Sequence, residues 1–243
     1  MKYLLHKFLP LNDRSLNYGE KIIRSWLKKI DSNNVLDVGA GQGRDLEIVK
    51  SLNKDANLKA IENFEPSIDL LEKKGINVSK INIENDLFPY SAESFDLIIA
   101  NQILEHCKEI FWIHHEIFRT LKVGGYLIVG VPNLAAYYNR LALLFFGMQP
   151  FCISLDGAHV RAFTNHGYKR FLFSALGNKH IIQSFKGANF VPFPKNLALV
   201  MSKIFPNSST CIFFLVQKSK EYDGEFLKIT NNLETPFWLG GKF

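Results

Sequence analysis

A short apolar segment that breaks into alternating glycines constrains the fold of this chain most strongly. Residues 35–38 read Val-Leu-Asp-Val and lead into Gly39, Gly41 and Gly43. The apolar run predicts a short buried strand, and the glycines let a bound molecule lie directly against the main chain. Residues 45–50 have helix-forming composition, so the first amide groups of a helix are expected to face that molecule. The pattern therefore predicts a strand, a glycine turn and a helix that together hold a nucleoside cofactor.

The spacing of the glycines argues against a dinucleotide cofactor. The dinucleotide fingerprint requires glycine at its first, third and sixth positions, and Arg44 is sixth when Gly39 is first. A nicotinamide or flavin cofactor is therefore disfavoured. A nucleotide-dependent oxidoreductase stays open as an alternative, as does a catalytically silent scaffold that keeps the cofactor fold. A tight strand-to-helix turn without a ligand is the third alternative.

Three stretches carry a family resemblance. Asp37 followed by the three glycines resembles the first motif of the class I S-adenosylmethionine-dependent methyltransferases. Residues 94–106, which end in Asn-Gln-Ile-Leu-Glu-His, resemble the fourth strand and following turn of members with a leucine-glutamate-histidine signature. Residues 118–133 resemble the helix end, Gly-Gly turn and fifth strand of the same family. The chain is therefore identified as similar to methyltransferases of the type 11 and type 23 kind.

The resemblance implies S-adenosyl-L-methionine as the cofactor and a set of residues that bind it. Glu62 comes nineteen residues after Gly43, at the end of the second expected strand, where a carboxylate accepts hydrogen bonds from ribose hydroxyls. Asn82, with Ile83 as an apolar wall, is expected beside the adenine, where the family often has Asp and where Glu84 is the alternative. The full set expected to bind the cofactor is Asp37, Gly39, Ala40, Gly41, Gly43, Glu62, Asn82, Ile83, Asn101 and Gln102.

Apolar strands alternate with helical stretches between residues 34 and 132, which predicts parallel βαβ units. The expected fold class is α/β, with a doubly wound, mostly parallel sheet that has helices on both faces. The resemblance implies seven strands and the Rossmann-like methyltransferase fold. We expect the sixth and seventh strands at residues 180–184 and 210–218.

One methyltransferase domain is expected over residues 1–218. It begins with an amino-terminal helix at 15–30 and carries an acceptor-side insertion at 134–165. The insertion opens with a helix that is apolar on nearly every side, which fits a lid, a lipid contact or ordinary packing. The carboxyl-terminal tail, 219–243, is expected to be irregular, but its aromatic and aliphatic residues indicate that it docks on the domain.

Methyl transfer from a sulfonium needs in-line approach, so positioning supplies most of the acceleration. O-methylation would also use a base, for which His106 is the first candidate and His159 the second. Packing is the alternative for His106, and Glu105 is expected to be structural or exposed. His159 and Arg161 point the same way if their segment is extended, so Arg161 is expected to hold an anionic group of the substrate. A helix cap and a salt bridge are the alternative for this pair.

The charge and the cysteine content of the chain limit the partners, metal sites and location that we expect. The net charge of +6 is concentrated in residues 1–30, where seven basic side chains stand against two acidic ones. This segment suits an anionic substrate, peripheral contact with a membrane, or a solvated helix face. Nucleic acid is not expected, which leaves a small-molecule, glycan or lipid-like acceptor. The three cysteines lack ligand spacing, so no metal site is expected and a cytoplasmic location is the simplest. The oligomeric state stays open.

Overall fold

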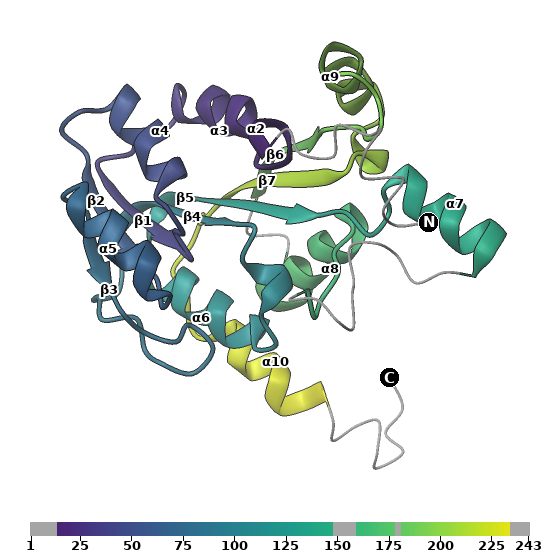
Figure 1. Ribbon diagram of the computed structural model, residues 1–243. Coiled ribbons are helices and arrows are strands. Elements are labelled where there is room, and N and C mark those ends of the chain that lie inside the picture. The colour runs from purple at the N-terminus through teal and green to yellow at the C-terminus, as the bar shows by residue number, and fades with distance from the viewer. Residues whose placement is uncertain (1–13, 148–158, 178–180, 234–243) are drawn as a thin grey trace.

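The computed structural model describes residues 14–147, 159–177 and 181–233. A seven-stranded sheet lies at the centre of the molecule, with helices on both faces (Figure 1). The strand order is β3-β2-β1-β4-β5-β7-β6, in which β7 runs antiparallel to both of its neighbours and the other pairs are parallel. The strands are β1 (Asn34–Val38), β2 (Asn57–Ile61), β3 (Asn77–Ser79), β4 (Phe95–Asn101), β5 (Leu121–Pro132), β6 (Ile181–Ala188) and β7 (Cys211–Gln217). The predicted α/β, doubly wound and mostly parallel sheet is confirmed.

Helices connect most of the strands and cover the sheet. The α-helices are α2 (Arg14–Asn17), α3 (Glu20–Leu27), α4 (Arg44–Leu52), α5 (Glu65–Lys73), α6 (Ile110–Thr120), α7 (Tyr137–Phe146), α8 (Asn165–Leu176), α9 (Lys195–Ile204) and α10 (Glu225–Leu233). Within the described ranges there are two short 3₁₀ turns, η1 (Leu104–His106) and η3 (Pro206–Ser208). Thr164 caps the start of α8, because its Oγ1 accepts a hydrogen bond of 2.9 Å from the amide of Gly167. Among the described residues, no helix is both long enough and apolar enough to span a bilayer.

Successive side chains of each strand point to opposite faces of the sheet, so they pack into two separate hydrophobic cores. Leu36 and Val38 of β1 are buried on the face covered by α6, α8 and α10. Val35 is buried on the opposite face, against α3, α4 and α5. Because both faces are covered, the central strands carry consecutive apolar residues, such as Leu97, Ile98 and Ile99 of β4, in place of a strict alternation with polar ones.

The order of the strands reverses at β1, which fixes where a ligand can bind. β1 pairs in parallel with β2 on one side and with β4 on the other, so the connections leave in opposite directions along the sheet. Loops at the carboxyl ends of such strands separate and leave a crevice, where ligands of open α/β sheets bind. The glycine turn after β1 lies at this crevice.

Two expected elements differ from the structure. The helix expected at 15–30 is divided into α2 and α3, because Gly19 between them has a φ of +66°. A Cβ at Gly19 would lie 2.4 Å from the ring of Phe213, so the chain passes close to β7 at this point. The sixth strand, expected at 180–184, continues to Ala188, because β6 pairs with β7 over that length. Residue 180 lies outside the described residues.

The expectation of an irregular tail is wrong for residues 225–233, which form helix α10. Phe226 is fully buried, and its ring lies 5.3 Å from the ring of His114 and 5.5 Å from that of Phe118, centre to centre. Aromatic burial of this size explains why the segment docks, as the composition indicated. The domain core therefore extends beyond residue 218.

The helix at the start of the expected insertion is α7, and its second half is exposed. Leu144, Phe145 and Phe146 expose 74%, 69% and 72% of their surface, whereas Asn139 and Ala142 are buried. Packing on the core therefore accounts for one side of the helix only. The insertion continues through residues 148–158, which lie outside the described part of the chain.

Candidate functional site

The three glycines after β1 all have positive φ angles, but they serve different purposes. A Cβ at Gly39 would lie 2.5 Å from the side chain of Ile103, and one at Gly43 would lie 2.6 Å from Leu71. Close packing within the protein therefore requires glycine at both positions. Gly41 has a φ of +51°, and no heavy atom of the described residues lies within 4 Å of its Cβ position. Its open face is where a ligand can meet the main chain.

The glycine turn is held against the end of β2. The amides of Gly39 and Ala40 donate to the carbonyl of Ile61 at 2.9 and 3.3 Å. Glu62 Oε2 accepts from the amide of Gly41 at 2.7 Å. The other carboxylate oxygen accepts from the amides of residues 63 and 64 at 2.8 and 3.0 Å. The structure thus brings Glu62 to the glycine turn, although the two residues are twenty-one positions apart in the sequence.

Acidic side chains lie close together beneath this turn. Asp37 is 3% exposed, and its pKa is raised well above the usual value, first by burial, then by the charge of Asp45 and, more weakly, by that of Glu62. Asp45 is partnered: its carboxylate accepts from Arg44 Nη2 at 2.7 Å and from Asn101 Nδ2 at 2.8 Å. Three carboxyl groups beside one crevice favour a ligand with a positive charge.

Two polar atoms at the end of β4 have no hydrogen-bond partner among the described residues. They are Asn101 Oδ1 and Gln102 Nε2, and both are buried. Gln102 also has a φ of +58°, an uncommon conformation for a residue other than glycine. A buried polar atom without a partner costs about 1–3 kcal/mol. Each atom therefore has an unused capacity for a hydrogen bond at the carboxyl end of β4.

The predicted adenine-contacting residues lie in the loop after β3. Asn82 is exposed, and its Oδ1 accepts from the amide of Glu84 at 3.1 Å, which shapes the loop as an Asx turn. Ile83 packs against the core cluster that contains Leu104. Glu84 Oε1 accepts from the amides of residues 108 and 109. Glu84 therefore connects the loop to the start of α6, which leaves Asn82 as the polar side chain proposed for adenine.

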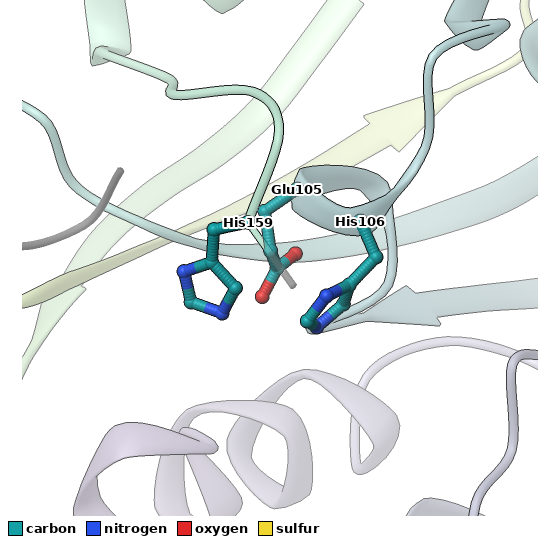
Figure 2. Close-up of side chains that lie close together, drawn as sticks. All are labelled: Glu105, His106 and His159. Carbon is teal, nitrogen blue, oxygen red and sulfur yellow. The ribbon is translucent and has the colours of Figure 1, made fainter. Parts of the chain in front are cut away.

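A second group of side chains converges beside η1. Glu105, His106 and His159 each offer a nitrogen or oxygen atom, and these atoms all lie within 4.8 Å of one another (Figure 2). The two imidazole rings meet edge to face, with 4.7 Å between their centres. The carbonyl of Glu105 accepts from the amides of Val160 and Arg161 at 2.9 and 3.1 Å, which fixes the two chain segments together.

Glu105 is more deeply buried than the sequence predicted. It is 1% exposed, and burial raises the pKa of its carboxyl to about 8. Its Oε2 atom has no hydrogen-bond partner among the described residues. The expectation of a structural or exposed side chain did not include a buried carboxyl between two histidines. The only sequence signal for a role of Glu105 is that it follows Leu104 in the leucine-glutamate-histidine signature. Its contact with His159 could not be predicted, because the two residues lie far apart in the sequence.

Arg161 and the two histidines of α6, His114 and His115, each have polar partners in the structure. Arg161 Nη2 donates to the carbonyl of Lys108 at 2.8 Å, and its Nε is buried without a partner among the described residues. Arg161 is thus directed toward the start of α6. His114 bonds to the Tyr168 hydroxyl at 2.9 Å inside the core, and His115 to the Tyr222 hydroxyl at 3.0 Å. Both histidines therefore make structural contacts with tyrosine hydroxyls.

The strand order and the crevice define the class to which the protein belongs, the Rossmann-like methyltransferase fold. A solved structure from Thermotoga maritima, described as an SAM-dependent methyltransferase and possible histamine N-methyltransferase, has this fold. It superposes with a TM-score of 0.55 at 18% sequence identity and covers 83% of this chain and 89% of its own. At that identity the comparison shows the fold alone.

The chain belongs to the family described as methionine biosynthesis protein MetW, whose model matches residues 19–178. An uncharacterized protein of Methanocaldococcus jannaschii is 26% identical over 140 residues, which are 56% of this chain and 64% of that protein. A bifunctional methionine biosynthesis protein MetXA/MetW of Rhodopirellula baltica is 24% identical over 143 residues, 56% of this chain and 22% of that protein. The chain thus spans less than two thirds of either relative.

Proposed function

We propose that this protein is a methyltransferase that uses S-adenosyl-L-methionine to methylate an oxygen of a small-molecule, glycan or lipid-like acceptor. The observation that carries the proposal is the open face of Gly41, whose amide donates to Glu62 at the carboxyl end of the neighbouring strand. The similar structure from Thermotoga maritima, itself described as SAM-dependent, supports the choice of cofactor.

Each part of the cofactor has a proposed partner. Asp37 and the backbone of residues 39–43 would hold the methionine part, whose ammonium group compensates the buried acidic charge. Glu62 would accept from the ribose hydroxyls. Asn82 and Ile83 would border the adenine. Asn101 Oδ1 and Gln102 Nε2 would form hydrogen bonds with the bound molecule. The residues present fit the cofactor, because the acceptors and the open main chain lie at the same edge of the sheet.

The acceptor is proposed to lie beside Glu105, His106 and His159. The transferable methyl is already activated by the sulfonium, so the protein chiefly has to align the acceptor oxygen with it. A hydroxyl also has to lose its proton, and the group beside η1 follows directly after the proposed cofactor residues of β4. His106 is the first residue proposed to act there, with His159 second. Arg161 would hold an anionic part of the acceptor through its unpartnered Nε.

The experiment that tests this function is turnover with hydroxylated acceptors. S-adenosylhomocysteine formed from the cofactor is measured against a panel of sugars, lipid-like alcohols and small hydroxylated metabolites. An accepted compound should gain one methyl on oxygen, and His106→Ala should lower its rate about a hundredfold. A loss of less than a few-fold would mean that His106 has a packing role and does not act as a base. Methylation on nitrogen or carbon would contradict the proposed acceptor chemistry.

A further inference from the structure

The group beside η1 has the composition of a metal site rather than of an ordinary polar cluster. Figure 2 shows the carboxylate of Glu105 between the imidazoles of His106 and His159. Each side chain offers one atom that can bind a metal ion, and these atoms lie within 4.8 Å of one another. The three residues come from η1 and from the segment before α8, which are tied by the amides of Val160 and Arg161 on the carbonyl of Glu105.

The burial of Glu105 supplies an independent reason to expect a ligand here. The side chain is 1% exposed, and Oε2 has no hydrogen-bond partner among the described residues. A buried carboxylate is stable only if it is paired, protonated or bound to a metal. Among the described residues, two imidazoles lie beside this carboxylate, and no lysine or arginine forms an ion pair with it. Imidazole nitrogen and carboxylate oxygen are ligands that a metal ion can share.

We propose that Glu105, His106 and His159 bind a divalent first-row transition cation such as Zn²⁺ or Mn²⁺. Two imidazoles and one carboxylate match the preferences of these ions, whereas Mg²⁺ and Ca²⁺ are held mainly by oxygen. A cation at about 2.0–2.2 Å from each ligand requires the three donor atoms to approach to about 3–3.5 Å. The proposed site therefore requires rotation of the side chains, since backbone hydrogen bonds fix the two segments. Three protein ligands leave at least one coordination position open.

The open position gives the cation a role in the reaction, and this part rests on the proposed function. A hydroxyl of the acceptor that coordinates the cation loses its proton more readily, and the proton passes to water. The resulting oxygen forms a bond to the methyl carbon as the bond from that carbon to sulfur breaks, which leaves a neutral thioether. His106 and His159 are then ligands, and the cation takes the place of a general base.

Cation binding is tested on the full chain after dialysis against a chelator. Zn²⁺ is titrated by calorimetry, and Co²⁺ is followed by its visible absorption. We expect one equivalent to bind, and Glu105→Gln and His159→Ala to weaken binding by on the order of 10- to 100-fold or more. His166→Ala is the matched control, because His166 is exposed at the start of α8 and lies outside the group. Its affinity should equal that of the unchanged protein.

S-adenosylhomocysteine is titrated into the same proteins to keep the two proposals apart. It should bind all variants alike, which also shows that they are folded. If Zn²⁺ does not bind, or binds equally well to Glu105→Gln and His159→Ala, the metal site is overturned whatever the cofactor does. If Zn²⁺ binds at this group and S-adenosylhomocysteine does not bind, the metal site stands and the proposed function falls.

Discussion

At the scale of single residues, the three glycines of the turn after β1 differ in what surrounds them. Gly39, Gly41 and Gly43 look equivalent in the sequence, and only the folded chain shows that Ile103 and Leu71 occupy the space beside two of them. Those neighbours lie far along the chain, so no local pattern predicts them. Gly41 is left as the position where a side chain would enter the proposed cofactor site without touching the protein.

The substitution Gly41→Ala tests this assignment, with Gly75→Ala as its control. Gly75 lies after α5, has a φ of +73° and is equally free of neighbours, so both variants carry the same kind of backbone strain, about 1–2 kcal/mol. Only Gly41→Ala should lower the affinity for S-adenosylhomocysteine, by about tenfold or more, because its methyl group meets the ligand. Calorimetric titration measures both. Unchanged affinity in Gly41→Ala would place the ligand elsewhere.

His114 makes stability depend on pH. Burial lowers its pKa to about 4, from an ordinary value of 6.5 in the unfolded chain. The unfolded state therefore binds the extra proton first, and the stability present above pH 6.5 is lost as the pH falls toward 4. Between pH 7 and pH 5 this loss is about 2 kcal/mol.

The variant His114→Phe isolates this contribution. Its free energy of unfolding, measured by denaturant titration at both pH values, should fall by about 2 kcal/mol less than that of the unchanged protein. The variant also leaves the Tyr168 hydroxyl without its partner, so the difference between the two pH values is the informative quantity. Equal pH dependence in both proteins would contradict a buried neutral imidazole.

At the scale of elements, the sequence predicted strands better than helix ends. The apolar runs of β1, β4 and β5 follow from residue type alone, because both faces of the sheet are covered. The break between α2 and α3 depends instead on Phe213, which lies in the last strand of the sheet. The group of Glu105, His106 and His159 was hidden for the same reason. Residues 159–161 meet η1 through tertiary hydrogen bonds and through the ring contact between His106 and His159.

Helix α10 shows the same dependence on distant contacts, and Phe226→Ala tests its place in the core. Phe226 is fully buried against α6 and α8, so its truncation should cost about 3–5 kcal/mol of unfolding free energy. Leu144→Ala on α7, a side chain that is 74% exposed, is the control and should change stability by less than about 0.5 kcal/mol. Denaturant titration compares the two. A loss below about 1 kcal/mol in Phe226→Ala would mean that α10 is not part of the core.

At the scale of the whole molecule, the reversal of strand order at β1 brings the proposed cofactor residues to one edge of the sheet. Asp37, Glu62 and Asn101 come from three strands or their ends and reach the same crevice. Family motifs in the sequence predicted this part, since parallel strands end at the same edge. The acceptor side could not be predicted in the same way, because it is built from segments without a recurrent motif.

The central claim is that this crevice binds S-adenosyl-L-methionine, and the most direct measurement is a calorimetric titration with S-adenosylhomocysteine. NAD is the control ligand, because it shares the adenosine part but needs the dinucleotide fingerprint that Arg44 interrupts. We predict saturable, micromolar binding of S-adenosylhomocysteine at one site per chain and no binding of NAD. Failure of S-adenosylhomocysteine to bind, or saturable binding of NAD in its place, would contradict the account.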